Sequence, residues 1–328
     1  MTVRGPNVVV TRRLPAEVEA RLADSFPTTL NSEDRRLSRD ELRAAMAATD
    51  VLVPTITDRI DADMLAGAGP RLKLIANFGA GVDHIDLEAA GRAGIAVTNT
   101  PGVLTEDTAD MALALILAVV RRVPEGLAEM QAGRWQGWAP TAFLGGRIRG
   151  RGLGILGMGR IGQALARRAL ALGMSIHYHN RRRLPGETEA ALSARYWDSL
   201  DRMMAHVDVL SVNCPHTPAT YRLVNARRLK LMKPSAVIVN TSRGEVIDEA
   251  ALTRALRTGE IAGAGLDVFE RGHDINPRLR ALETVVLLPH MGSATREGRI
   301  ETGERVIANI AAFAEGRPLP DLCRAADF

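Results

Sequence analysis

Residues 152–162 read GLGILGMGRIG, and this stretch decides the fold of the chain around it. The apolar run at 152–156 predicts a buried strand, and three glycines follow it in the spacing G-x-G-x-x-G as a helical pattern begins. Such glycines allow a tight turn, close approach of a ligand to the backbone, and packing of helix on strand. The N-terminus of the helix then offers N–H groups to phosphates. The predicted dinucleotide-phosphate site consists of Gly157, Gly159, Arg160, Ile161 and Gly162.

The end of the next apolar run, residues 174–179, indicates which dinucleotide is expected. NAD enzymes usually place a carboxylate about 20 residues beyond the glycines, where it accepts from the ribose 2′-hydroxyl. Asn180 stands there instead, and Arg181 and Arg182 follow it. Because no carboxylate is present at this position, a 2′-phosphate would not be repelled, and arginines can bind such a phosphate through forked hydrogen bonds. We therefore expect NADP(H) to be preferred, with NAD(H) possible; the alternative is a solvated arginine loop.

Short apolar runs alternate with helical patterns along the whole chain. The predicted strands lie at 8–11, 51–55, 72–77, 95–98, 152–156, 174–179, 207–212, 236–240, 262–268 and 285–288. Helices are predicted at 38–48, 105–122, 160–172, 249–257 and 296–314. This alternation is typical of α/β proteins with parallel sheets. The middle of the 105–122 segment is apolar on all sides, which predicts a helix buried between two domains.

Bulk composition favours a protein of the reducing cytoplasm. The 328 residues suit two domains, and 46% apolar with 24% charged residues is ordinary for a soluble globular protein. The net charge of +4 comes without a basic block interleaved with aromatics, so no nucleic-acid partner is expected. Two cysteines give neither a disulfide framework nor a metal-ligand pattern. No signal peptide is expected, because the apolar run near the N-terminus is short and soon ends at Arg12 and Arg13. No membrane span is expected either, because the most apolar stretch, 111–120, is too short.

Further motifs follow one another in a characteristic order. They are NFGAGVD at 77–83, TPGVLT at 100–105, DTAD at 107–110, CPHTPAT at 214–220, NTSRG at 240–244, GLDVF at 265–269 and PHMGSAT at 289–295. Together with the glycine motif they cover nearly the whole chain. The sequence thus resembles the D-isomer-specific 2-hydroxyacid dehydrogenases, most closely the glyoxylate/hydroxypyruvate reductases.

The resemblance implies two Rossmann-like, doubly wound domains with a cleft between them. A discontinuous substrate-binding domain would comprise residues 1–101 and 291–328, and a dinucleotide-binding domain residues 102–290. The family is usually dimeric, so a homodimer is expected. Trp135 and Trp138 follow the long helix, and either one reaches the partner's active site or both serve dimer packing.

The resemblance also assigns roles to individual residues. His290 would act as general acid, and Arg243 would pair with the substrate carboxylate and polarise the carbonyl. The N–H groups of Ala80 and Gly81 would hold the other carboxylate oxygen, and Ser293 would touch the substrate or cap a turn. Asp267 would contact the carboxamide end of the nicotinamide. The remaining expected cofactor contacts are Thr108, Cys214, Pro215, Thr220, Thr241, Ser242 and His290.

The pattern breaks at Gly272. The family usually has a glutamate there, five residues after the Asp267 position, which orients the catalytic histidine. Glu270 or Asp274 could replace it, His290 could work unassisted, or catalysis could have been lost.

The expected function is NADPH-preferring reduction of glyoxylate, hydroxypyruvate or a similar 2-oxo acid to the D-2-hydroxy acid. The alternative is a catalytically weakened NAD(P)-binding sensor or corepressor-like protein, which Gly272 alone favours.

Overall fold

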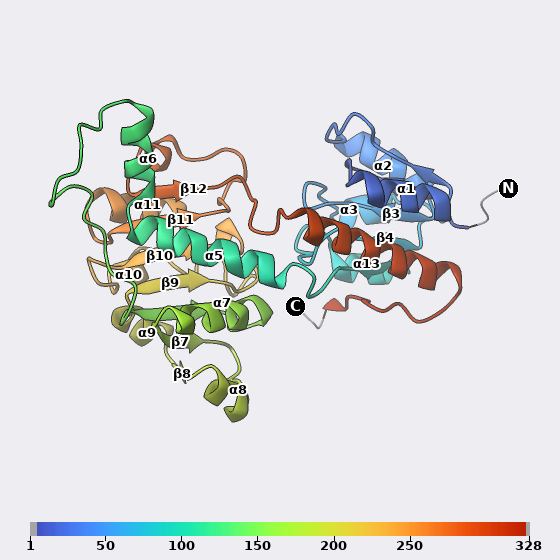
Figure 1. Cartoon of the computed structure of the whole chain (residues 1–328). Helices are drawn as coiled ribbons and strands as arrows, with labels where there is room; N and C mark the ends of the chain where they lie inside the picture. The colour runs from blue at the N-terminus through green and yellow to red at the C-terminus, as the bar shows by residue number, and fades with distance from the viewer. Residues whose placement is uncertain (1–4, 326–328) are drawn as a thin grey trace. The chain divides into compact units, whose positions relative to one another are not determined.

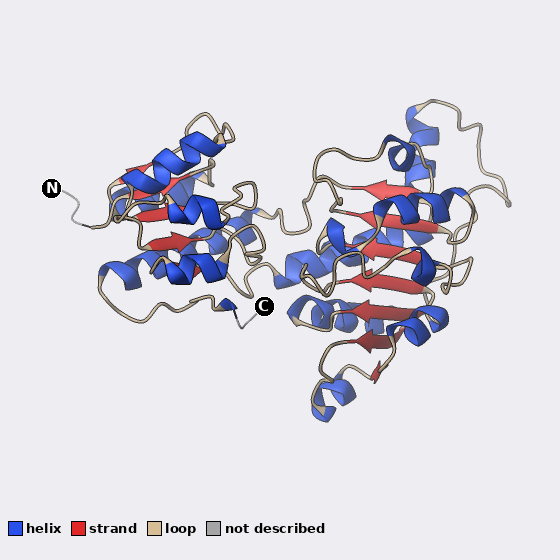
Figure 2. Cartoon of the chain, turned by 180° about the vertical axis from the view of Figure 1, so that it is seen from behind, coloured by secondary structure: helices blue, strands red, loops and turns tan. Residues whose placement is uncertain are grey.

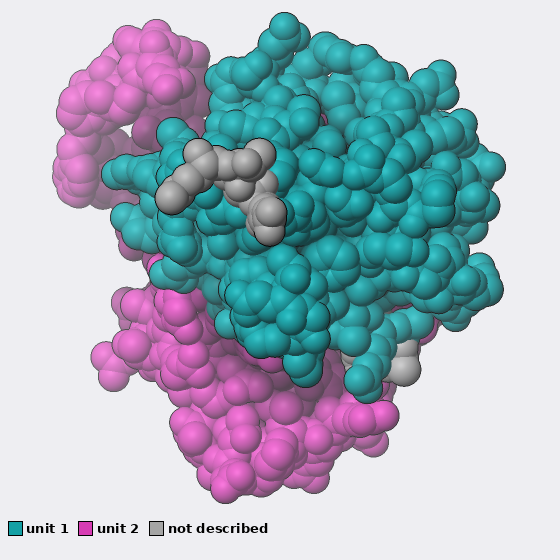
Figure 3. Space-filling view, turned by 90° about the vertical axis from the view of Figure 1, so that its right-hand side faces the viewer, with its two compact units in different colours: residues 1–104, 294–328 teal, residues 105–293 magenta. Residues whose placement is uncertain are grey.

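The computed structural model describes residues 5–325, and the chain divides into two compact units (Figure 3). Unit 1 comprises residues 1–104 with 294–328, and unit 2 comprises residues 105–293. Each unit is a parallel sheet with helices on both faces, which confirms the predicted class of two Rossmann-like α/β domains (Figures 1 and 2). No helix within residues 5–325 has the length and apolar character that a membrane span requires.

Unit 1 is built on a five-stranded sheet in the order β2-β1-β3-β4-β5. The strands are β1 (Val8–Val10), β2 (Thr28–Thr29), β3 (Val51–Val53), β4 (Leu74–Ala76) and β5 (Ala96–Thr98), all parallel. The helices are α1 (Ala16–Ser25), α2 (Arg39–Ala48), α3 (Ala62–Ala66), α4 (Leu87–Arg92) and α13 (Arg296–Ala314). Along β3, Val51 and Val53 join the core under α1 and α13, while Leu52 joins the core under α2 to α4. The two-residue strand β2 was not predicted from the sequence.

Unit 2 carries a seven-stranded parallel sheet in the order β12-β11-β10-β9-β6-β7-β8. The strands are β6 (Gly152–Leu156), β7 (Ser175–His179), β8 (Ala194–Tyr196), β9 (Val209–Val212), β10 (Val237–Asn240), β11 (Gly263–Leu266) and β12 (Val285–Leu287). The order reverses at β6, which has β7 on one side and β9 on the other. In open α/β sheets the carboxyl end of such a switch point is where ligands bind.

Helices cover both faces of this sheet. They are α5 (Thr105–Val120), α6 (Val123–Gln131), α7 (Arg160–Ala171), α8 (Gly186–Ala191), α9 (Leu200–His206), α10 (Ala226–Leu229), the 3-10 helix η1 (Gly244–Val246), α11 (Glu249–Arg257) and α12 (Pro277–Arg280). Helices α5 and α7 pack on one face, and α9 to α11 on the other. The predicted bounds of α11, α13 and β6 match the structure.

Helix α5 differs from the prediction in two ways. It ends at Val120, because Arg122 adopts φ +54° and a new helix, α6, begins at Val123 with Pro124 in its first turn. Within unit 2 only one side of α5 is fully buried, through residues such as Leu115 and Ile116, whereas Ala114 on the other side is exposed. Helix α5 therefore carries more apolar surface than unit 2 buries by itself.

Residues 123–146, named here the α6 arm, stand away from the sheet in Figure 1. The described residues have twelve exposed large apolar side chains, and seven of them lie in the arm. These seven are Val123, Leu127, Met130, Trp135, Trp138, Phe143 and Leu144. A concentration of this kind on one segment is typical of an interaction surface.

Candidate active site

The glycine motif forms a tight turn between β6 and α7. Gly157 has φ +98°, and a Cβ atom there would lie 2.6 Å from the backbone nitrogen of Cys214, so only glycine fits. A Cβ atom on Gly162 would lie 2.6 Å from the carbonyl oxygen of Gly157, so this glycine lets α7 pack against the turn. Two of the predicted glycine roles thus have a direct steric basis.

The start of α7 is suited to an anion. The first intrahelical bond runs from the Gln163 N–H to the Gly159 carbonyl, 2.9 Å, and the N–H groups of residues 159–162 have no hydrogen-bond partner within residues 5–325. Within residues 5–325, no atom beyond its two chain neighbours lies within 4 Å of the position a Cβ would take on Gly159. Free N–H donors, a helix dipole and open space beside a glycine fit the pyrophosphate of a dinucleotide.

Asn180 is tied to the glycine turn by its own side chain. Its Oδ1 accepts from the N–H of Met158 at 2.7 Å, so it helps to hold the turn in place. The arginines after it differ from one another: Arg183 makes a bidentate pair with Glu189 at 2.8 and 2.9 Å, whereas Arg181 and Arg182 are exposed and have no partner in the described chain. The loop is thus anchored at Arg183 and leaves two guanidinium groups available.

The loop after β9 crosses directly beneath the glycine turn. Burial raises the pKa of the Cys214 thiol to about 12, so this cysteine is an inert packing residue at neutral pH. The Thr220 hydroxyl donates to the Pro215 carbonyl at 2.7 Å and accepts from the Thr217 N–H at 2.7 Å. Thr220 therefore fixes the shape of the loop, and Cys214 and Pro215 present backbone beside the predicted phosphate site.

The loop after β10 is organised by Asn240, which is buried. Its Oδ1 accepts from the N–H and hydroxyl of Ser242 at 3.0 and 2.9 Å, and its Nδ2 donates to the Arg243 carbonyl at 2.8 Å. The Arg243 guanidinium is half-buried, with Nη1 donating to the Ser242 carbonyl at 2.9 Å. The buried Thr241 hydroxyl has no partner within residues 5–325, so it remains available to a ligand.

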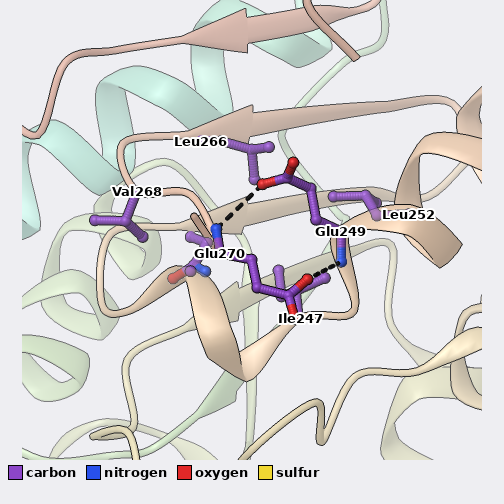
Figure 4. A pocket seen from close by; sticks show the side chains of 8 residues that line it. Ile247, Glu249, Leu252, Leu266, Val268 and Glu270 are labelled. Atoms are coloured by element: carbon purple, nitrogen blue, oxygen red, sulfur yellow. Dashed lines mark hydrogen bonds between the residues drawn. The ribbon is translucent and has the colours of Figure 1, made fainter. Parts of the chain in front are cut away.

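The loops after β10 and β11 pack tightly together. A Cβ atom on Gly244 would lie 2.0 Å from the Phe269 carbonyl carbon, so the two loops depend on this glycine for their contact. A small pocket behind them is shown in Figure 4, lined by Asn240, Gly244, Ile247, Glu249, Leu252, Leu266, Val268 and Glu270. Glu249 and Glu270 bridge it reciprocally: the side chain of each accepts from the backbone N–H of the other, at 3.1 and 3.2 Å.

His290 lies in the loop after β12, in a conformation that Asp267 fixes. Its φ is +55°, a left-handed value that is uncommon for histidine. The N–H of His290 donates to the Asp267 carbonyl at 3.0 Å, and the next two N–H groups, of Met291 and Gly292, donate to the two Asp267 carboxylate oxygens, each at 2.7 Å. Burial raises the pKa of Asp267, opposed by these two donors and by the positive charge of His290.

The position of the missing glutamate has its own backbone requirement. Gly272 is exposed and has φ +60°, a conformation in which a glutamate side chain would be strained. Of the two carboxylates considered as replacements, Glu270 pairs with Arg222 at 2.6 Å and accepts from the Glu249 N–H. Asp274 pairs with Arg271 at 3.1 Å. Both carboxylates therefore have other partners in this structure.

The remaining predicted residues fall in both units. Ala80 and Gly81 lie in unit 1, in the loop after β4, and their N–H groups have no partner in the described chain. Arg243, His290 and Ser293 belong to unit 2, and Ser293 is half-buried. Thr108 on α5 is buried, with its methyl carbon 3.7 Å from the Cβ position of Gly292. Within residues 5–325 no cluster of histidine, cysteine or carboxylate side chains is arranged to hold a metal ion.

Sequence reasoning missed the residues that shape these loops. Asn77, Asn99 and Asn240 bind backbone carbonyls of the predicted site residues Gly81, Ala80 and Arg243, and Glu249 binds the backbone N–H of Glu270. A signal was present for two of them, because Asn77 directly follows the buried strand β4, Asn240 is the last residue of the buried strand β10, and a glycine-containing turn comes after each. Asparagine in such a place favours side-chain bonds to nearby backbone.

Comparison with known proteins agrees with this geometry. Residues 113–292 match the family described as D-isomer specific 2-hydroxyacid dehydrogenase, NAD binding domain. A glyoxylate reductase of Thermococcus litoralis is 45% identical over 97% of this chain and 96% of its own length. One from Aeropyrum pernix is 44% identical over 98% of this chain and 96% of its own length.

Solved structures show the same fold over the same length. A putative D-isomer specific 2-hydroxyacid dehydrogenase from Polaromonas superposes with a TM-score of 0.91 at 38% identity, covering 98% of this chain and all of that one. An NADPH-dependent glyoxylate/hydroxypyruvate reductase from Sinorhizobium meliloti, in complex with NADP and malonate, gives 0.87 at 36% identity, covering 98% of this chain and 97% of that one.

These matches confirm the predicted resemblance and the predicted enzyme class. They extend across both units, including the glycine turn, whose free N–H groups suit an anion. The chain belongs to the D-isomer specific 2-hydroxyacid dehydrogenase family and is an NAD(P)-dependent oxidoreductase.

Proposed function

We propose that the protein reduces glyoxylate, hydroxypyruvate or a related small 2-oxo acid to the D-2-hydroxy acid, with NADPH as the preferred reductant. The observation that carries this proposal is the pair of loops in unit 2 that present Arg243 and His290, each held by a buried side chain, Asn240 and Asp267. Relatives that are 41 to 45% identical over almost the whole chain are glyoxylate reductases.

The residues suit the chemistry of carbonyl reduction. When bound, the reduced nicotinamide supplies the hydride that the carbonyl carbon receives. The Arg243 guanidinium would pair with the substrate carboxylate and stabilise negative charge on the carbonyl oxygen. His290 would donate the proton that this oxygen needs. The N–H groups of Ala80 and Gly81 would bind the second carboxylate oxygen. Three further residues would contact cofactor or substrate: Thr108 near the start of α5, Thr241 in the loop after β10 and Ser293 in the loop after β12.

Support for NADPH comes from the loop after β7. Arg181 and Arg182 are exposed cations without partners in the described chain, while Arg183 anchors the loop to Glu189. Asn180 brings no negative charge to this place because its side chain is a neutral amide, and its oxygen accepts from the Met158 N–H. A 2′-phosphate would therefore meet two available guanidinium groups and no carboxylate from Asn180.

The function is tested by following absorbance at 340 nm with NADPH and NADH, using glyoxylate, hydroxypyruvate, pyruvate and phenylpyruvate. We expect turnover with NADPH, and a rise of about tenfold or more in KM for NADPH in the Arg181→Ala/Arg182→Ala double variant, because charge-assisted hydrogen bonds are lost. KM for NADH should change little. Arg167→Ala, on the exposed side of α7, controls for loss of surface charge.

Two outcomes would contradict the proposal. Equal efficiency with both cofactors in the unmodified enzyme would remove the NADPH preference and leave the reductase in place. Tight NADPH binding without turnover of any 2-oxo acid would favour the binding-protein alternative.

We also infer that the protein is a cytoplasmic homodimer that pairs through the α6 arm. Seven exposed apolar side chains on one projecting segment support a protein partner, and the half-exposed side of α5 leads into it. Neither cysteine forms a disulfide, as is usual in a reducing compartment.

Sedimentation velocity tests the pairing. Leu127→Glu should shift the protein to monomer by weakening the dimer about a hundredfold or more, because a charge would be buried in an apolar interface. Leu172→Glu replaces a comparably exposed leucine at the end of α7 and should leave the dimer intact. An unchanged dimer in Leu127→Glu would place the interface elsewhere.

A further inference from the structure

The loop at residues 77–83 has three consecutive carbonyl groups bound by two asparagine side chains. Asn77 Nδ2 donates to the Gly79 carbonyl at 2.9 Å and to the Gly81 carbonyl at 3.0 Å. Asn99 Nδ2 donates to the carbonyl between them, that of Ala80, at 2.7 Å. The direction of each of these three carbonyl groups is therefore fixed by a hydrogen bond.

A planar trans peptide couples each carbonyl to the next N–H, because the two groups point in opposite directions. Where Asn77 binds the Gly79 carbonyl, the Ala80 N–H must face away from Asn77. Where Asn99 binds the Ala80 carbonyl, the Gly81 N–H must face away from Asn99. Both N–H groups lack a partner within residues 5–325, although each is fixed in direction. Oriented, unused N–H groups of successive small residues are suited to hold an anion.

Both asparagines are themselves held. Asn77 is buried; its N–H donates to the Thr98 carbonyl at 2.9 Å, and its Oδ1 lies 3.0 Å from His84 Nε2. The N–H of Asn99 donates to the Asp321 carbonyl at 3.3 Å. The loop is thus connected to the C-terminal segment as well as to the neighbouring strand.

Asp321 is a firm support for Asn99. Its buried carboxylate makes a bidentate pair with Arg305, 2.7 Å for both bonds, and accepts from Asn309 at 2.8 Å. Both of these partners lie on α13, the helix that closes unit 1. An unbroken series of contacts therefore runs from α13 through Asp321 and Asn99 to the Ala80 carbonyl.

We propose that Asn77 and Asn99 are positioning residues that orient the N–H groups of Ala80 and Gly81 toward the substrate carboxylate. The proposal rests on the proposed function, which places a 2-oxo acid carboxylate at these two groups. The asparagines contact neither substrate nor cofactor in this scheme, and their effect passes entirely through the backbone. A carboxylate is present in both the ground state and the transition state, so the expected effect is on KM rather than kcat.

Asn99 is the residue to test, because it is half-exposed and its replacement leaves the core intact. Asn99→Ala should raise KM for the 2-oxo acid about three- to tenfold, the value of one hydrogen bond, with kcat changed less than about twofold. Asn99→Gln keeps the amide donor and should recover part of the loss. Asn31→Ala is the matched control, since Asn31 also donates to two backbone carbonyls of unit 1, at 2.8 and 2.7 Å, away from this loop.

Binding of oxalate, measured by calorimetry on the enzyme saturated with NADP⁺, gives a second readout that needs no turnover. Weaker oxalate binding in Asn99→Ala, by the same factor as KM and absent in Asn31→Ala, would support the proposal. Unchanged KM and oxalate affinity in Asn99→Ala would overturn it while the reductase function stands. If the unmodified enzyme binds oxalate but reduces no 2-oxo acid, the proposed function fails, and the oxalate comparison still decides the role of Asn99.

Discussion

Replacing His290 with asparagine is expected to lower kcat by about 10²- to 10⁴-fold, the usual contribution of a positioned general acid. Asparagine is the informative substitution because His290 has φ +55°, and asparagine tolerates that backbone conformation better than other side chains with a Cβ. The loop should therefore keep its shape, including the hydrogen bond from its backbone N–H to Asp267. The loss can then be assigned to the missing imidazole.

The measurement is steady-state reduction of the best 2-oxo acid, with KM and NADPH affinity determined in parallel. Both should stay within a fewfold of their original values, since the proton is transferred only as the carbonyl is reduced. His273→Asn is the control, because His273 is an exposed histidine of the same unit. If His290→Asn retained kcat within about fivefold, the proton would have to come from another group, and the role assigned to His290 would be wrong.

Local patterns were sufficient to predict the fold. The apolar run of β6, the glycine spacing after it and the amphipathic run of α11 are each read from residues within a dozen positions of one another. The short strands β2 and β8 were missed because their residues carry no apolar run, and β8, residues 194–196, lies at the edge of its sheet. The break before α6 depends on the left-handed conformation of Arg122, which could not be predicted because arginine has no preference for that conformation.

The supporting contacts of the site could not be predicted in the same way. Asn180 binds Met158 across 22 residues, Asn99 binds Ala80 across 19, and Asp267 binds Met291 and Gly292 across 24 and 25. Each pair meets only because parallel strands bring their carboxyl ends to one edge of a sheet. Which asparagine or aspartate then turns toward which backbone group follows from the fold, and no spacing in the sequence encodes it.

Asp267 is the second residue whose replacement should have a large effect, and its structural position predicts a different signature from that of a cofactor contact. In Asp267→Asn the amide oxygen can accept only one of the two N–H groups of Met291 and Gly292, while the amide NH₂ faces the other. A buried N–H without an acceptor costs about 1–3 kcal/mol, and the loop should relax to avoid it. His290 would move with its loop, and a shift of about 1 Å at a catalytic group can cost 10²-fold in rate.

We therefore expect Asp267→Asn to lower kcat by about 10²-fold while the dissociation constant for NADPH, measured by fluorescence titration, rises much less. Asp208→Asn is the matched control: Asp208 is also a unit 2 aspartate that accepts from a backbone N–H, that of Gly152 at 2.8 Å, and it pairs with Lys233. It lies before β9, at the other end of the strands, so its replacement should affect stability and leave kcat unchanged.

The pH dependence separates the two possible roles of Asp267. Burial raises its pKa, so as the pH falls its carboxylate takes up a proton earlier than an ordinary aspartate and loses an acceptor for the loop. The unmodified enzyme should then lose kcat on the acid side as this group is protonated, and the loss should be missing from Asp267→Asn, whose amide resembles the protonated form. If Asp267 served the nicotinamide alone, its replacement would raise the NADPH dissociation constant by more than it lowers kcat. That result, with an unchanged acid limb, would mean that the loop carrying His290 keeps its conformation without Asp267.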